Sequence, residues 1–400
     1  MLNRVINIAG TGCALADFFY NHVDFTADKF QKFASKTSGD GGLSPGKLVF
    51  TNELENFTQK SYSEILRELV GKSEYSSVNL GGPSLVSLIH VAQMLPQTQY
   101  KVSFYGCTGT DETATVIRNK VAKTPLNTDN YVAIDSENTA FTHVLTDPIY
   151  DNGHGERTFI NNIGASWKYT SELLPDSFFD ADIVCFGGTA LVPQIHDNLE
   201  QLLRKVKSRG GITIVNTVFD FRSEKENPRE KWPLGQTEEC YKNIDLLIMD
   251  CEEALSISGC STMDEAAAFF KSTALVSFVI TNGNKNLLAY SNGSFFKALP
   301  VRAFPVSEQV GIDMRSQPTL IGDTTGCGDN FAGGMIASVA QQIKHSQTGG
   351  FDMIEAISWG VASGGFACFY VGGTWFEEKE GEKLERVKIY QQLYLKQIGR

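Results

Sequence analysis

Short apolar runs alternate with amphipathic stretches through the second half of the chain, from about residue 166 onward. Four of the runs have the length of buried strands and lie at 183–186, 212–215, 246–249 and 277–281. Apolar residues recur at helical spacing from Ile195 to Val206, and Thr262 with Glu265 forms a capping box that starts another helix. Short apolar strands separated by amphipathic helices predict a parallel sheet covered by helices on both faces. Ligands of such sheets bind at the carboxyl ends of the strands.

The first half of the chain has a less regular pattern. Residues 5–9 form a strand-like run, and the glycine pair Gly81-Gly82 precedes a helix with one apolar face. Residues 139–147 and 156–162 alternate in polarity like the two arms of a hairpin. The sequence Asp151-Asn-Gly153 between them is a good turn signal, so we expect a hairpin there.

Residues 24–78 interrupt this pattern with a polar segment that contains one apparent helix at 62–70. Nothing in the segment identifies a known motif. We interpret it either as an elaboration of a lid over a ligand site or as a subunit contact, such as that of a homodimer.

Composition limits the possible functions. At 400 residues and 42% hydrophobic, the chain can bury the core of one large α/β unit or of two smaller domains. The net charge of -11 argues against nucleic acid as a partner, because phosphate backbones require a basic face. Small nucleotides remain possible, since a local anion site and a metal ion can bind them.

Location is indicated by what the sequence lacks. No apolar stretch is long enough to span a membrane, and the N-terminal run is too short and too polar for a signal peptide. The eight cysteines are scattered without metal-binding spacing, and several lie in apolar runs. We therefore expect reduced, buried thiols in a cytoplasmic protein without disulfides.

The most informative stretch for chemistry is the glycine-rich turn Gly326-Cys327-Gly328, which leads directly into a helix. The free N–H groups and dipole of a helix start, together with small residues, can bind a phosphate. Asp329 in the first turn would lie beside that anion with its carboxylate free to accept a proton. The same residues also fit a plain glycine-rich connection in which Asp329 caps the helix.

This stretch resembles a known signature. The run from Asp323 to Asp329 matches the Asp-Thr-x-Gly-Ala-Gly-Asp motif of the ribokinase family of sugar and nucleoside kinases (the PfkB type), with Cys327 in place of Ala. The resemblance implies a ribokinase-like α/β fold, in which a central, mostly parallel sheet carries helices on both faces and a small β lid. It implies ATP-dependent phosphorylation of a primary hydroxyl group with Mg²⁺. Asp329 would be the base, and the amides of Gly326, Cys327 and Gly328 would form the anion hole.

The resemblance extends to substrate residues. Asp17 matches the family Asp that binds substrate hydroxyls, and Gly81 with Gly82 matches the glycine pair over the sugar. Glu156 matches a lid Glu that contacts the sugar. From the residues alone, Asp17 also fits a turn and Glu156 a solvated hairpin residue. Val86 stands where the family has Asn.

The resemblance also implies nucleotide and cation sites. Asp250 and Glu253 correspond to an Asn-x-x-Glu motif near magnesium and the phosphates, with Asp250 replacing Asn, so that Glu253 would act on Mg²⁺ indirectly. Thr281 and Gly283 correspond to residues that pack near the nucleotide. Asp323 and Thr325 match positions that help to hold a monovalent cation, K⁺, in ribokinases.

The resemblance suggests how the chain is divided. We expect residues 1–13, 79–130 and 166–400 to form a large nucleotide-binding domain. Residues 14–78 and 131–165 would form the lid and the insert over the substrate.

Three functions remain open at this stage. Glu156 and the run 155–165 favour a sugar or sugar acid as the small-molecule substrate. The stretch 104–111 and the helix after Gly82 are closer to nucleoside kinases of the adenosine type. Val86 and Asp250 leave room for a ligand-binding protein on the same fold that has no catalytic activity.

Overall fold

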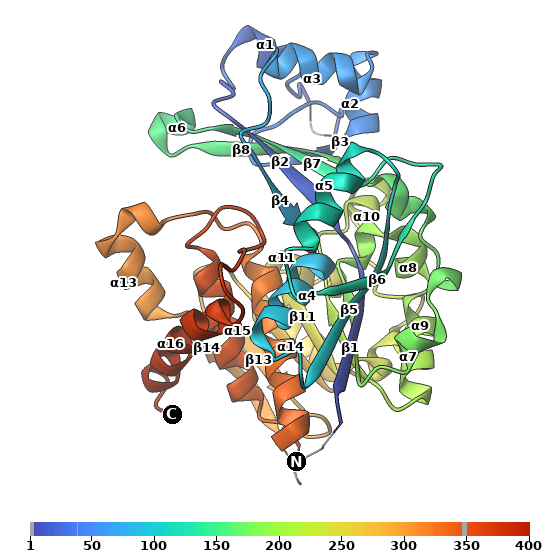
Figure 1. The fold of residues 1–400 in the computed structure, drawn as a ribbon, viewed down its shortest axis with the longest axis vertical. Coiled ribbons are helices and arrows are strands. Elements are labelled where there is room, and N and C mark those ends of the chain that lie inside the picture. The colour runs from blue at the N-terminus through green and yellow to red at the C-terminus, as the bar shows by residue number, and fades with distance from the viewer. Residues whose placement is uncertain (1–3, 38, 346–349) are drawn as a thin grey trace.

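The main layer of the protein is a nine-stranded sheet in a computed structural model that describes residues 4–37, 39–345 and 350–400 (Figure 1). Residues 1–3 of the expected first segment therefore lie outside the described part. The strands run in the order β14-β13-β12-β11-β10-β9-β1-β5-β6. Their bounds are β1 Ile6–Gly12, β5 Tyr100–Thr108, β6 Asn127–Ala133, β9 Ile183–Gly187, β10 Ile212–Asn216, β11 Leu246–Asp250, β12 Ser277–Thr281, β13 Leu287–Ser291 and β14 Leu299–Phe304.

Seven of these strands are parallel, and only β13 and β14 pair antiparallel at one edge. All four strands predicted in the second half of the chain are confirmed to within one residue. The sequence pattern did not reveal β13 and β14.

Side chains from successive strand residues enter two separate cores, as the alternation of a strand requires. Ile8 packs in the first core and Ala9 in the second, and the same alternation holds for Cys185 and Phe186 of β9. The first core lies under α4 Pro83–Met94, α5 Glu112–Val121, α14 Cys327–His345, α15 Met353–Ala367 and α16 Glu382–Gln397. The second lies under α7 Asp176–Phe179, α8 Pro193–Asp197, α9 Leu199–Ser208, α11 Cys251–Ser258 and α12 Met263–Ser272. Helices therefore cover both faces, as predicted (Figure 1).

A second, five-stranded sheet stands over one end of the first (Figure 1). Its order is β3-β8-β7-β2-β4, with β2 Leu15–Asn21, β3 Leu48–Phe50, β4 Ser77–Gly81, β7 Phe141–Asp147 and β8 Glu156–Asn162. The strands β7 and β8 form the expected hairpin. Their connection is not the tight turn that we predicted, because residues 150–153 form a helical turn, α6 Tyr150–Gly153. Asp151 there has φ of 50°.

The polar segment after β2 folds onto this smaller sheet. It contains β3 and three helices, α1 Asp28–Gln31, α2 Thr51–Thr58 and α3 Tyr62–Val70. Leu54, Ile65 and Leu69 are fully buried beneath these helices. The segment is thus a packed layer with its own share of the first core.

Further helices border the two sheets. They are α10 Phe221–Glu226 and α13 Glu308–Ser316, with the short 3₁₀ helices η1 Gly164–Lys168, η2 Ser171–Leu173, η3 Thr189–Leu191, η4 Glu238–Asn243 and η5 Pro318–Leu320.

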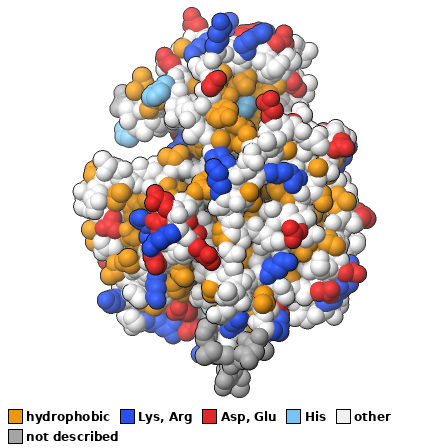
Figure 2. All heavy atoms as spheres, in the orientation of Figure 1, with side chains coloured by type: hydrophobic (Ala, Val, Ile, Leu, Met, Phe, Trp, Pro, Cys, Tyr) orange, Lys and Arg blue, Asp and Glu red, His pale blue; other side chains and the backbone are white. Residues whose placement is uncertain are grey.

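Surface chemistry is mixed. On the face drawn in Figure 2, lysine and arginine side chains are interspersed with aspartate and glutamate. Within the described ranges, we find no helix with the length and apolarity that a membrane crossing needs.

Candidate active site

The residues of the signature lie where α14 begins, at the carboxyl end of the large sheet. Asn330 holds this loop in place, since its side-chain amide donates to the carbonyls of Gly326 (2.8 Å) and Gly373 (2.9 Å). Gly326 has φ of 74°, and a Cβ there would lie 2.6 Å from the Cα of Gly373. A Cβ on Gly328 would meet no protein atom within 4 Å. The loop is therefore packed on one side and open in front of the helix start, where an anion would bind.

Asp329 is half-buried in the first turn of α14. Desolvation by the surrounding protein raises the pKa of its carboxyl group to about 7. The negative charge of Asp329 in turn raises the pKa values of Asp17 and Glu253. Asp329 is thus electrostatically coupled to both the expected substrate side and the expected nucleotide side of the site.

Asp17 is buried on β2 against the glycine pair. A Cβ on Gly81 would lie 2.2 Å from Oδ2 of Asp17, and one on Gly82 (φ 91°) would lie 2.6 Å from the carbonyl oxygen of Cys13. Burial raises the pKa of Asp17 to about 7, although a hydrogen bond from Thr142 opposes the shift. The bare backbone of both glycines is therefore needed to accommodate Asp17 and the β1–β2 crossing.

The expected nucleotide residues lie on neighbouring strand ends. Asp250 and Thr281 are paired residues of β11 and β12. Asp250 caps α11, accepting from the N–H of Glu253 (2.8 Å), and Oε2 of Glu253 accepts from the N–H of Asp250 (2.9 Å). The hydroxyl of Thr217 also donates to Glu253, yet burial raises the pKa of Glu253 to about 8. Gly283 (φ 55°) follows in an open turn.

These carboxylates fit a magnesium ion that arrives with a nucleotide. Two acidic side chains at one strand end offer the oxygen ligands that Mg²⁺ prefers, and burial together with the negative charge of Asp250 raises the pKa of Glu253. A resident metal centre is a different matter. Among the described residues, no three His, Cys, Asp or Glu side chains are grouped to hold one.

Asp323 and Thr325, expected to hold K⁺, bind a guanidinium group instead. Nη1 of Arg157 lies 3.2 Å from Oδ2 of Asp323 and 3.1 Å from the hydroxyl of Thr325. The carboxylate of Asp323 also accepts from the N–H groups of Thr325 and Gly372. In the described structure, these residues therefore do not fit a free monovalent cation.

Glu156 lies on β8 next to Arg157 and is exposed. Its carboxylate accepts from the N–H of Arg157 and lies near Gly46 of the inserted segment. Because successive strand residues point to opposite faces, Arg157 reaches the signature loop and Glu156 does not. The structure does not bring Glu156 to the other predicted site residues. Sequence reasoning missed Arg157, although the residue is adjacent to the one that it chose.

Two further polar residues support the loop and were also missed. The ammonium group of Lys383 on α16 donates to Asn330 Oδ1 (3.0 Å) and to Gln93 Oε1 (3.0 Å). Burial lowers the pKa of Lys383 to about 7. Tyr370 also donates to Asn330. The sequence signal for this network was Asn330, a polar residue that directly follows Asp329 in the predicted helix. Val86 is buried against Gly373, so it packs inside the protein and does not bind a ligand there.

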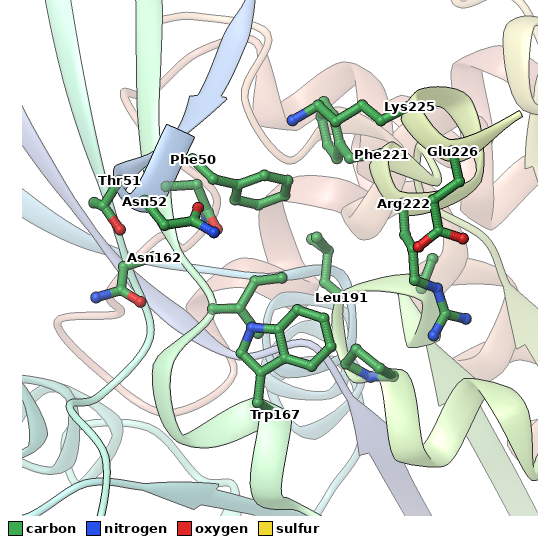
Figure 3. Close-up of a pocket in the computed structure, with 14 residues that line it drawn as sticks. Phe50, Thr51, Asn52, Asn162, Trp167, Leu191, Phe221, Arg222, Lys225 and Glu226 are labelled. Atoms are coloured by element: carbon green, nitrogen blue, oxygen red, sulfur yellow. The ribbon is translucent and has the colours of Figure 1, made fainter. Parts of the chain in front are cut away.

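A cavity of about 320 Å³ adjoins this site between the smaller sheet and the large body (Figure 3). Figure 3 shows the rings of Phe50 and Trp167 on opposite sides of the cavity, with Phe221 beside Phe50. Asn161 in its wall donates to the hydroxyl of Thr142, which in turn hydrogen bonds Asp17. One chain of hydrogen bonds therefore connects the cavity with the carboxylate of Asp17.

Comparison with solved structures confirms the fold. The adenosine kinase from Schistosoma mansoni in complex with 2-fluoroadenosine superposes with a TM-score of 0.67 at 18% identity, over 92% of this chain and 97% of the other. Ribokinase from Thermotoga maritima gives 0.61 at 16%, over 97% and 99%. A putative ribokinase II from E. coli in complex with ATP and Mg²⁺ gives 0.60 at 15%, over 98% and 100%. These likenesses identify a ribokinase-like fold.

Sequence comparison identifies the family. Among curated proteins, the cytidine kinase of Thermococcus kodakarensis is 26% identical over 181 residues, which are 45% of this chain. The chain thus aligns with 55%, or about half, of the length of that relative. The family model of the pfkB family carbohydrate kinases matches residues 51–379, which include the glycine pair, β8 and the complete signature. The chain therefore belongs to the pfkB family of carbohydrate kinases.

Proposed function

We propose that this protein is an ATP-dependent kinase that phosphorylates a primary hydroxyl group of a sugar or a sugar-containing molecule. The observation that carries the proposal is the placement of Asp329. This half-buried carboxyl group, with a pKa raised to about 7, lies directly after the open glycine turn at the start of α14. A base with a pKa near neutrality beside an anion site is what transfer of a phosphoryl group to a hydroxyl requires.

In the proposed reaction, the acceptor hydroxyl gives its proton to Asp329 while its oxygen attacks the γ-phosphorus of ATP, and ADP leaves. Backbone N–H groups at Gly326, Cys327 and Gly328 stabilise the charge on the phosphoryl oxygens. Asp17 binds a second hydroxyl of the acceptor and so orients the attacking one. Glu253 and Asp250 would hold Mg²⁺, which when bound would neutralise part of the charge on the phosphates.

The acceptor class has two candidates. A sugar or sugar acid is favoured by Asp17, whose buried carboxyl group beside the glycine pair can bind hydroxyl groups. A nucleoside is favoured by the cavity with the aromatic rings of Phe50, Trp167 and Phe221, because a nucleobase gains by stacking on such rings. The names of the cytidine kinase and adenosine kinase relatives support the second candidate.

The test is ADP formation from ATP and Mg²⁺ with a panel of sugars, sugar acids and nucleosides. We expect turnover with one class, a phosphomonoester product by ³¹P NMR, and a fall of about 10²–10⁴-fold in kcat for Asp329→Asn. Unchanged turnover in Asp329→Asn would contradict the base assignment. Ligand binding without turnover on the whole panel would favour a binding protein.

Trp167 distinguishes the two acceptor classes. If a nucleobase occupies the cavity, Trp167→Ala will raise the KM for nucleosides and leave any residual turnover of free sugars unchanged. Trp375, a partly buried residue outside the cavity lining, provides the control Trp375→Phe. If Trp167→Ala affects nucleosides and free sugars equally, the cavity is not part of the acceptor site.

A further inference from the structure

Two cysteines meet at the signature loop. Cys327 is the first residue of α14 and belongs to the glycine turn, and Cys368 caps the end of α15. Their sulfur atoms are 3.6 Å apart. Both residues are half-buried, so a small solute can reach them, whereas Cys13, Cys107, Cys185 and Cys240 are buried. Among the described residues, no other pair of cysteine sulfurs is in contact.

The backbone around the two thiols is already tightly connected. A Cβ on Gly364, one turn before Cys368, would lie 2.9 Å from the carbonyl oxygen of Cys327. The N–H of Gly322 donates to the carbonyl of Cys368 (2.9 Å), and that of Asp323 donates to Tyr370 (3.1 Å). The segments that carry the thiols therefore run side by side. The sulfurs need to approach by only about 1.5 Å to reach the bond length of a disulfide.

We propose that Cys327 and Cys368 form a reversible oxidative modification site, at which a hydroperoxide converts the two thiols into a disulfide that stops phosphoryl transfer. The sulfur of Cys368 attacks a peroxide oxygen, the O–O bond breaks, and a sulfenic acid and water form. The sulfur of Cys327 then attacks the sulfenic sulfur, the S–O bond breaks and a second water leaves. Two thiols and hydrogen peroxide thus give one disulfide and two waters, with both electrons coming from sulfur.

The hydrogen bond between the thiols assigns these roles. Either thiol can donate in this contact, and it lowers the pKa of Cys368, whereas the same contact and burial raise the pKa of Cys327. Thiolate is the nucleophilic form, so Cys368 reacts first and Cys327 resolves the intermediate.

The expected consequence for activity depends on the function proposed above, whereas bond formation does not. The amide of Cys327 belongs to the anion hole, and Asp329 follows two residues later. A covalent link to α15 would draw the start of α14 toward Cys368 and fix a loop that must adjust around the phosphoryl group. Oxidation should therefore lower kcat.

The experiment treats the full chain with hydrogen peroxide, blocks free thiols with an alkylating reagent and maps disulfides by peptide mass spectrometry. We expect a Cys327–Cys368 peptide pair, loss of kinase activity, and recovery of both with dithiothreitol. Cys368→Ala should keep its basal activity and resist peroxide. Cys260→Ala, which removes a half-buried cysteine away from the proposed site residues, should remain sensitive.

Peptide mapping separates this proposal from the proposed function, because it needs no turnover. Absence of the pair under conditions that oxidise Cys260 would overturn the modification site. Formation of the pair with full activity would overturn its effect on transfer. If the untreated protein shows no turnover but peroxide still forms the pair, the modification site is supported and the kinase assignment is refuted.

Discussion

Three acidic residues from different parts of the chain share one electrostatic environment at the site. Asp17, Glu253 and Asp329 all have pKa values raised to about 7 or 8, chiefly by burial. Each would be close to its ordinary, much lower value in the unfolded chain. At these three positions the folded protein therefore binds more protons than the unfolded chain between about pH 4 and 7. The contribution of the three groups to stability falls as pH rises through that window.

Asp329→Asn should accordingly stabilise the protein while it removes activity. Above pH 7 the folded protein keeps a desolvated charge at Asp329 that an amide does not carry. We expect the free energy of unfolding to rise at both pH values, and by about 1–2 kcal/mol more at pH 8 than at pH 5, because at pH 5 the carboxyl group is protonated in the folded protein and ionised only in the unfolded chain. Denaturant titrations at both pH values measure this. The exposed Asp135 gives the control Asp135→Asn, and an equal gain there would contradict the explanation.

The second prediction at the residue scale concerns potassium. The guanidinium of Arg157 forms an ion pair with the carboxylate of Asp323. We therefore expect turnover to be the same in potassium and in tetramethylammonium salts of equal ionic strength. Arg157→Gln should lower kcat, while Arg157→Lys should retain more activity through its charge. Strong activation of the unaltered protein by K⁺ would contradict this contact.

At the level of elements, the crossings between the two sheets shape the proposed substrate site. Strand β2 continues from β1, and β4 leads into α4 through the glycine pair. The site residues therefore lie at junctions between a rigid large sheet and the smaller one. Strand ends suit precise positioning of side chains, and Arg157 of β8 adds a direct contact between the smaller sheet and the signature loop.

Gly81→Ala tests one of these junctions. The backbone of Gly81 is not in the left-handed region. The cost of the substitution therefore arises from the new Cβ, which would lie 2.2 Å from Oδ2 of Asp17. We expect a higher KM for the acceptor. If the effect acts through Asp17, Gly81→Ala will add nothing in an Asp17→Ala background, as a double-mutant cycle measures. If the losses of acceptor affinity from the two substitutions are additive, Gly81 is needed for the backbone conformation and not for the position of Asp17.

The sequence predicted those elements and residues that are defined locally. The four parallel strands of the second half were found from short apolar runs, and the signature was found because its residues are contiguous. Arg157 contacts Thr325 across 168 positions, and Lys383 contacts Asn330 across 53, so no local pattern marks either pair. Glu156 was chosen over Arg157 because a strand pattern alone does not say which face meets the loop.

On the scale of the whole molecule, the inserted segment contacts the large body directly. The ammonium group of Lys225 on α10 lies 2.6 Å from Glu53 of α2 and 4.3 Å from the centre of the Phe50 ring. Phe50 and Phe221 also meet edge to face. These contacts close one side of the cavity. We therefore interpret the segment as part of the lid.

Lys225→Met tests this interpretation. The ion pair between Lys225 and Glu53 is partly exposed, so its loss should change the free energy of unfolding by no more than about 1 kcal/mol. The KM for the acceptor should rise, because the insert no longer holds the cavity closed, and kcat should change less. Lys242→Met breaks a surface pair with Glu239 away from the cavity and serves as the control. Unchanged KM in Lys225→Met would separate the insert from substrate binding.

The central position of β1 has a consequence for how the protein is made. Strand β1 pairs with β5 and β9, and β9 leaves the ribosome about 170 residues after β1. At typical translation rates, β1 waits roughly 10–30 s for its second neighbour. Asp17 and the glycine pair precede Asp329 by more than half of the chain. A nascent chain would therefore present its acceptor residues well before it carries the base that completes the kinase.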